Sequence, residues 1–231
     1  MFKRIAQTAG FAGLLAALLL TLLQSLWVTP LILEAETYES SEPVAEHSHA
    51  AGAAAHEHQH DEDAWAPEDG AQRTLFTGLS NLVVAVGFAL MLAGLYSLRV
   101  PGRTWQGLLW GLAGFATFSL APAIGLPPEL PGTAAADLTL RQYWWIGTAA
   151  TTAAGLALLA FGGQWWLRIL GLLLLPLPHL LGAPQPEVHE SLAPAALSQH
   201  FIYVSLLANA LFWAALGLIS AWLFNRRQRA N

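Results

Sequence analysis

The chain has 231 residues, of which 55% are hydrophobic and only 11% are charged, and none is a cysteine. A soluble domain typically carries about 25% charged residues, so this composition argues against a water-soluble protein and favours an integral membrane protein. Without cysteine, the sequence excludes disulfides, thiolate metal sites and iron–sulfur clusters, so any metal site must use nitrogen and oxygen ligands. The net charge of −5 is concentrated in residues 34–69, which contain 11 of the 15 acidic residues and no Lys or Arg.

Six apolar stretches follow one another along the chain, and each is close to the roughly 20 residues that a helix needs to cross a bilayer. They comprise residues 5–31, 75–98, 105–124, 143–161, 165–181 and 201–224. The fifth is short and contains Pro176 and Pro178, which cannot donate helical hydrogen bonds. The sequence therefore predicts an all-α integral membrane bundle of about six transmembrane helices, or five if the fifth stretch is re-entrant.

The first stretch follows Lys3 and Arg4, as the apolar core of a signal peptide would. Its apolar run is longer than a typical signal-peptide core, and no small-residue cleavage site comes after it. We therefore expect residues 1–33 to be a retained first transmembrane helix. Residues 34–73 then form a long loop, and residues 74–231 form a bundle of five further helices.

The positions of the basic residues predict the orientation, because cytoplasmic loops are enriched in Lys and Arg. With six spans, one side receives Lys3, Arg4, Arg99, Arg103, Arg168, Arg226, Arg227 and Arg229. The other side receives only Arg73 and Arg141. This arrangement predicts that both termini are cytoplasmic and that the 34–73 loop is extracytoplasmic, whereas five spans would place the C-terminal arginines outside.

The 34–73 loop contains closely spaced histidines followed by acidic residues. The candidate metal ligands in it are His47, His49, His56, His58, His60 and Asp61. Side chains two residues apart point the same way in an extended chain, so an HxHxH run can present three imidazoles to one ion. Such ligands suit cobalt, nickel, zinc or copper, and a flexible site prefers copper or nickel to cobalt. We expect a disordered loop that captures cations without selecting the metal; the alternative is a solvated acidic linker whose histidines bind nothing or respond only to pH.

Polar residues near the outer ends of the spans form a second group of candidates. Because Pro176 and Pro178 break the helix before His179, its imidazole and the freed carbonyls are candidate cation ligands together with Glu34, Glu36 and Glu187. The alternative for His179 is an interfacial residue hydrogen-bonded to a neighbouring helix.

Other polar residues in or beside the spans are expected to have structural roles or to line a transport path. Within the spans, Gln24, Asn81 and Asn209 are expected to form hydrogen bonds between helices. Glu129, Asp137 and Arg141 bracket an outer loop, and an ion pair between Arg141 and Asp137 is expected to fix it.

Small residues predict where helices approach closely. Gly107 and Gly111 have GxxxG spacing, and Gly87 and Gly94 lie one heptad apart.

No P-loop, HExxH or GxSxG motif is present, so neither ATP hydrolysis nor familiar hydrolase chemistry is indicated. We expect no enzymatic activity and no nucleic-acid partner.

Five long segments stand out in order along the chain: WVTPLILEAETYE at 27–39, GLLWGLAGFATFSLAPAIGLPPELPG at 107–132, AADLTLRQYWW at 135–145, PHLLGAP at 178–184 and ALFWAALGLISAW at 210–222. Together they resemble the CbtA family, the proposed cobalt transporter subunit. The resemblance implies a multi-pass protein of the bacterial inner membrane, a role in cobalt uptake for cobalamin synthesis, and a small one-span histidine-bearing partner of the CbtB type. It also implies that Glu34, Glu36, Glu129, Asp137, Arg141 and His179 are motif positions. The family is often described with five spans.

The interpretation that unites these features is a subunit of a divalent cobalt uptake transporter. No tightly bound cofactor is indicated, and Co²⁺ is the expected transported ion. Entry of a dication at a membrane potential of 100 mV is favourable by about 4.6 kcal/mol. The alternatives are an extracytoplasmic metal sensor or scaffold that regulates a partner, and a transporter for nickel or zinc.

Overall fold

The computed structural model describes residues 2–39 and 67–229, and within these ranges the regular secondary structure is helical. The first helical segment comprises α1 (Phe2–Leu23), the π-helical turn η1 (Gln24–Val28) and α2 (Thr29–Glu39). The others are α3 (Ala71–Leu98), α4 (Gln106–Phe115), the π-helical turn η2 (Ala116–Leu120), α5 (Ala121–Gly125), α6 (Leu138–Phe161), α7 (Trp165–Leu174), α8 (Leu177–Leu181) and α9 (Ala195–Arg229). The loop ligands His47, His49, His56, His58, His60 and Asp61 lie outside the described residues.

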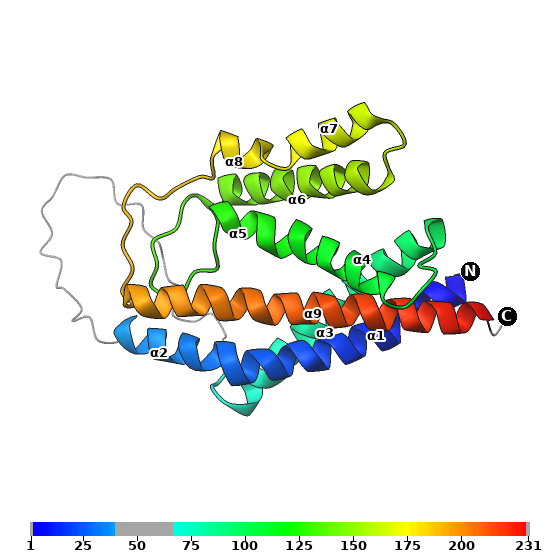
Figure 1. The fold of residues 1–231 in the computed structure, drawn as a ribbon. Coiled ribbons are helices and arrows are strands. Elements are labelled where there is room, and N and C mark those ends of the chain that lie inside the picture. The colour runs from blue at the N-terminus through cyan, green and yellow to red at the C-terminus, as the bar shows by residue number, and fades with distance from the viewer. Residues whose placement is uncertain (1, 40–66, 230–231) are drawn as a thin grey trace, which may run out of the picture.

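In the described part of the chain, five helical segments are long and apolar enough to cross a membrane. They are Phe2–Glu39, Ala71–Leu98, Gln106–Gly125, Leu138–Phe161 and Ala195–Arg227. The apolar segment Trp165–Leu181 is shorter, runs back beside α6, and brings the N- and C-termini to the same end of the bundle (Figure 1). The prediction of an all-α membrane protein is therefore confirmed.

The short segment Trp165–Leu181 is divided where the prolines predicted a break. Helix α7 ends at Leu174 and α8 begins at Leu177, with Pro176 between them. The Pro176 carbonyl instead accepts hydrogen bonds of 3.0 Å from the amides of His179 and Leu180. The described residues thus contain five long apolar helices, and the sixth predicted span corresponds to the shorter, broken segment Trp165–Leu181.

Two helix ends differ from the sequence expectation. The first helix continues to Glu39 and does not end at residue 33, so Glu34 and Glu36 lie on α2. The last helix begins at Ala195, before the expected residue 201. In both cases polar residues extend a helix beyond its apolar stretch, so hydropathy marks the membrane-embedded part and not the full helix.

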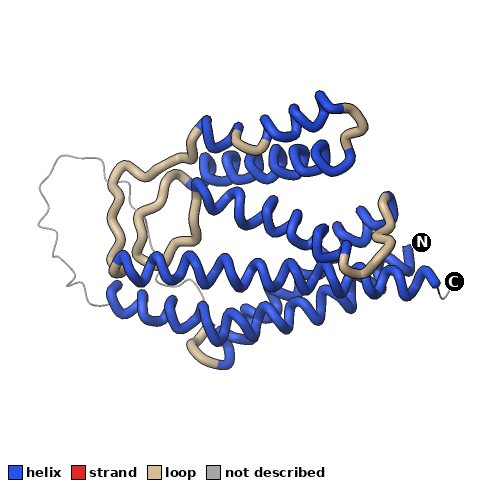
Figure 2. Tube along the Cα trace, viewed as in Figure 1, coloured by secondary structure: helices blue, strands red, loops and turns tan. Residues whose placement is uncertain are grey.

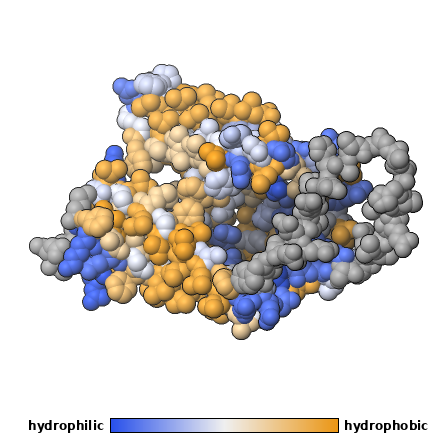
Figure 3. Space-filling view, turned by 180° about the vertical axis from the view of Figure 1, so that it is seen from behind, coloured by the Kyte–Doolittle hydropathy of each residue, from blue (hydrophilic) through white to orange (hydrophobic). Residues whose placement is uncertain are grey.

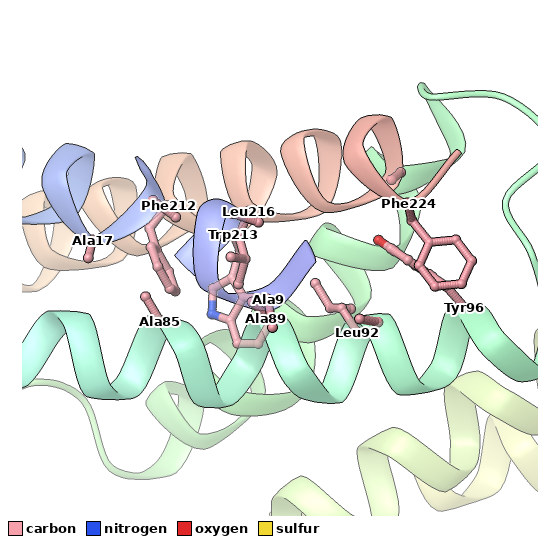
Figure 4. Packing of buried hydrophobic residues seen from close by; sticks show 14 of the residues in the cluster. Ala9, Ala17, Ala85, Ala89, Leu92, Tyr96, Phe212, Trp213, Leu216 and Phe224 are labelled. Atoms are coloured by element: carbon pink, nitrogen blue, oxygen red, sulfur yellow. The ribbon is translucent and has the colours of Figure 1, made fainter. Parts of the chain in front are cut away.

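The main core lies among α1, α3, α4 and α9. Alanines of α1 and α3, including Ala9, Ala12, Ala85 and Ala89, are fully buried, so the two backbones approach closely. Large side chains of α3 and α9 fill the remaining space, as Figure 4 shows for Leu92, Tyr96, Phe212, Trp213, Leu216 and Phe224. Close packing of small against large residues is the main source of stability between helices in lipid, where no hydrophobic force drives them together.

The α4–α9 contact depends on glycines. A Cβ built on Gly107 would lie 2.3 Å from the carbonyl oxygen of Gly217, and one on Gly111 would lie 2.2 Å from that of Trp213. The predicted close approach at Gly107 and Gly111 is therefore confirmed. By contrast, nothing lies within 4 Å of a Cβ built on Gly87 or Gly94. The prediction that another helix approaches closely at these two glycines is therefore wrong.

Helices α6, α7 and α8 form a hairpin beside this core (Figure 1). Gly155 of α6 and Gly171 of α7 face each other. A Cβ built on either glycine would lie 2.8 Å from the carbonyl oxygen of the other. Aromatic pairs join the hairpin to the rest, with ring centroids 5.7 Å apart for Trp110–Phe161. The loops that precede α6 and α9 lie together at one end of the helices (Figure 2), and apolar side chains cover much of the outer surface (Figure 3).

Candidate functional site

A network of ion pairs joins the C-terminal end of α2 to the N-terminal end of α3. Arg73, in the first turn of α3, contacts the Glu36 carboxylate with both of its terminal nitrogens, and its Nη1 lies 3.2 Å from Glu36 Oε2. The same Nη1 donates to Asp69 Oδ1 over 2.8 Å. The Arg73 and Glu36 side chains are only 31% and 32% exposed, whereas Asp69 is 71% exposed. Arg73 therefore sits between two carboxylates at the edge of the helix bundle.

A small cavity lies beside this network, between the first helical segment and α3. Its volume is about 90 Å³, which is room for several water molecules. Its walls are mostly hydroxyl-bearing or charged: Ser25, Thr29, Leu33, Asp69, Gly70, Arg73, Thr74 and Thr77. Oxygen atoms of this kind can solvate a cation that has lost part of its water shell.

Amide side chains continue the polar lining towards the middle of the bundle. Asn81 is only 9% exposed, and its Nδ2 donates to Thr21 Oγ1 over 3.0 Å and to Gln24 Oε1 over 2.7 Å. The hydrogen bonds predicted between helices for Asn81 and Gln24 are thus present. Asn81 lies eight residues after Arg73 on α3, which corresponds to a depth of about 12 Å.

These groups form one strip between α1 and α3, which we call the polar seam. It consists of Thr21, Gln24, Ser25, Thr29, Arg73, Thr74, Thr77 and Asn81. The π-helical turn η1 lies within it, and there the Thr29 amide bonds to the Gln24 carbonyl five residues back. Such turns commonly mark functional sites. Sequence analysis missed the seam's hydroxyls because single Ser and Thr residues are ordinary in apolar helices.

Helix α9, which contacts η1, carries two further polar residues within its apolar stretch, Ser205 and Asn209. Asn209 Nδ2 donates to the Ser205 carbonyl over 3.0 Å, which is a bond within α9. Asn209 was predicted to bond to another helix, but its side-chain amide bonds within α9. The Ser205 hydroxyl is buried and has no hydrogen-bond partner among the described residues.

The loop before α6 is held by a different ion pair from the predicted one. Arg141 Nη2 donates to Glu129 Oε2 over 2.8 Å. The Asp137 carboxylate instead accepts the Leu140 amide over 3.0 Å and so caps the N-terminus of α6. The predicted Arg141–Asp137 pair is wrong because Asp137 is the N-cap, where its carboxylate is directed to the free amides of the first turn.

His179 lies in a corner formed by segments that are distant in sequence. Trp144 of α6 donates its indole N–H to the Pro178 carbonyl over 3.3 Å, and its ring meets the His179 imidazole edge-on at 5.9 Å. A Cβ on Gly125 would lie 2.4 Å from the Trp144 ring, so the end of α5 packs directly against this indole. The Nδ1 atom of His179 is buried and lacks a hydrogen-bond partner within the described ranges.

The predicted meeting of Glu34, Glu36, His179 and Glu187 at one ion is not observed. Among residues 2–39 and 67–229, no three His, Asp or Glu side chains come together in a way that could hold a metal. The reason is topological: His179 belongs to the α6–α7–α8 hairpin, whereas both glutamates of α2 lie on the opposite side of α9 (Figure 1). Glu187 is an exposed residue of the loop before α9.

That loop and the loop before α6 border an open hollow of about 740 Å³. The backbones of the two loops are linked by hydrogen bonds from Ala134 to Glu190 (2.9 Å) and from Leu192 to Gly132 (3.2 Å). His189 and Glu190 line the hollow but are exposed to solvent. It is a surface depression and, unlike the polar seam, does not extend between helices.

Comparison with protein families identifies the chain. The family model described as "Probable cobalt transporter subunit (CbtA)" matches residues 2–225, so the chain belongs to this family. Comparisons with curated proteins and with solved structures find no match.

Proposed function

We propose that this CbtA-family protein is the membrane-spanning subunit of a system that takes up divalent cobalt across the bacterial cytoplasmic membrane and supplies it for cobalamin synthesis. The observation that carries the proposal is the family match over residues 2–225. The long apolar helices and the oxygen-lined polar seam between α1 and α3 support it. A transport subunit needs both a membrane-embedded body and a polar path through part of it.

The distribution of charge supports cytoplasmic termini. Both termini lie at one end of the bundle (Figure 1), and that end carries Lys3 and Arg4. Here Arg4 and Arg227 lie over the rings of Phe224 and Phe11, at 4.3 and 5.4 Å from their centroids. Arginine beside aromatic rings is typical of the membrane–water interface. In this orientation the acidic loop faces outward, and the membrane potential draws cations towards the basic end.

The proposed path begins at the histidine-rich loop. Its imidazoles and Asp61 raise the local concentration of the metal, and the carboxylates of Glu34 and Glu36 on α2 receive it at the outer end of the bundle. The hydroxyls of the polar seam then replace water around the ion as far as Asn81. His179, with its buried Nδ1 atom, is a separate candidate ligand on the hairpin, and Glu187 is a candidate at the outer surface. Glu129, Asp137 and Arg141 hold the outer loop in place.

The family description names a subunit, and a subunit requires at least one other chain. We propose a small one-span histidine-bearing protein of the CbtB type as that chain. It would supply nitrogen ligands that the polar seam lacks among its own residues.

Uptake of radioactive cobalt into proteoliposomes tests the proposal. The full chain is reconstituted with and without the small partner, and an inside-negative potassium diffusion potential is imposed. Cobalt should accumulate inside when the partner is present, and dissipating the potential should reduce the rate. Metal binding without flux under these conditions would instead favour a sensor or scaffold, and faster nickel or zinc flux would change the assigned substrate.

A further inference from the structure

We propose that Arg73 occupies the position of a divalent cation at the outer end of the polar seam, and that an entering ion must displace its guanidinium from Glu36 and Asp69. This inference rests on the proposed cation transport and adds to it a residue that sets the affinity for the ion. Arg73 would then act as a tethered competitor and a filter against monovalent cations.

The geometry places a positive charge where a metal ion would be expected. The guanidinium bridges two carboxylates, with Nη1 3.2 Å from Glu36 Oε2 on α2 and 2.8 Å from Asp69 Oδ1 just before α3. Directly beside it is the cavity whose walls carry the hydroxyls of Ser25 and Thr77. Two carboxylates with neutral oxygens nearby are a ligand set for a divalent cation.

The ion pairs are of a kind that can be exchanged. Arg73 and Glu36 are each about one-third exposed, so water screens their attraction, and such pairs have modest net stability. A dication carries twice the charge of the guanidinium and can therefore compete for the same two carboxylates. A monovalent ion has no such advantage over a group that is already tethered at high effective concentration.

The second outer ion pair provides a matched control. Arg141 and Glu129 are joined at 2.8 Å, and both side chains are 28% exposed, so their chemistry and burial resemble those of Arg73 and Glu36. Arg141 has no second carboxylate within the described ion pairs, and it lines neither of the two cavities described above. A general effect of removing an outer arginine should therefore appear at both positions, and a site-specific effect only at Arg73.

Calorimetric titration of Co²⁺ into the full chain in lipid nanodiscs tests the proposal. All proteins carry glutamine in place of His47, His49, His56, His58 and His60, so that the loop does not contribute. Arg73→Gln should lower the Kd for Co²⁺ about fivefold, since it removes a competing ion pair. In that variant Na⁺ should begin to compete, whereas Arg73→Lys and Arg141→Gln should remain close to the parent. An unchanged or higher Kd in Arg73→Gln would overturn the proposal.

A second measurement leaves Arg73 in place and so does not depend on that variant folding. The chain has no cysteine, so Thr77→Cys introduces a single thiol inside the cavity. Co²⁺ should slow its modification by an uncharged thiol reagent, because an ion that takes the place of Arg73 occupies the mouth of the cavity and coordinates the new thiolate. Equal rates with and without Co²⁺ would overturn the proposal. Both tests report on binding alone, so a failure of cobalt flux in proteoliposomes would count against the proposed function and leave this result standing.

Discussion

Gly111 of α4 lies so close to Trp213 of α9 that a Cβ at position 111 would be 2.2 Å from the Trp213 carbonyl oxygen. No rotamer change relieves this contact, because the obstacle is backbone. The helix pair therefore tolerates only hydrogen at this position, and the same holds at Gly107 against the Gly217 carbonyl. The α4–α9 contact positions η2 and α5, and through them the α6–α7–α8 hairpin.

Gly111→Ala should therefore destabilise the protein by roughly 1–3 kcal/mol, as overpacking of a closed contact does. Thermal unfolding in detergent, followed by tryptophan fluorescence, measures the effect. Gly147→Ala is the control, because nothing lies within 4 Å of a Cβ at that position of α6. It should be neutral or slightly stabilising, since alanine favours helix. Equal losses at both sites would contradict the assigned role of Gly111.

Asn81→Leu removes the two hydrogen bonds that Asn81 of α3 donates to the first helical segment, at 3.0 and 2.7 Å. We expect a loss of stability of about 0.5–1.5 kcal/mol, the range for polar contacts between membrane helices. Thr151→Ala is a control, because its hydroxyl bonds only to carbonyls of its own helix. If the seam conducts the ion, cobalt uptake per folded Asn81→Leu molecule should also fall. Normal uptake by the destabilised variant would assign Asn81 a structural role alone.

Asp137 offers a test of capping against ion pairing. Asp137→Ala should cost about 1 kcal/mol, because the first turn of α6 loses the acceptor for the Leu140 amide. Asp137→Asn should lower the stability by only about 0.3 kcal/mol, since asparagine caps helices as well as aspartate does. Comparing thermal unfolding of the two variants decides the matter. Equal destabilisation by both would show that the negative charge matters, as in the ion pair with Arg141 that the sequence suggested.

The histidine-rich loop should affect uptake mainly when cobalt is scarce. Replacing residues 47–63 with a Gly/Ser linker of equal length removes the capture step, so the cobalt concentration for half-maximal uptake should rise while the maximal rate stays similar. The uptake assay in proteoliposomes measures both values. A version with only the five histidines changed to glutamine separates imidazole binding from the acidic charge. If neither version alters the concentration dependence, the loop is only a tether.

The separation of Glu36 from His179 shows where sequence reasoning was insufficient. Apolar length and basic flanks predict the order and direction of the spans, and they place both residues near the same predicted side of the membrane. Apolar length and basic flanks do not determine whether Glu36 and His179 belong to the same site. Residues at the same depth can lie on opposite sides of a bundle, and only the packing of the hairpin against η2 and α5 fixes which side each occupies.

The sequence by itself determined the membrane class, the approximate spans, the break at Pro176 and the family. These follow from local properties: hydropathy over about 20 residues, the missing amide of proline, and ordered motifs. Tertiary structure alone decided that Gly111 and not Gly94 is in close contact, that Arg141 pairs with Glu129, and that Arg73 stands between Glu36 and Asp69 beside a hydroxyl-lined cavity. Each of these depends on the relative positions of helices far apart in the chain, which packing sets and local patterns do not encode.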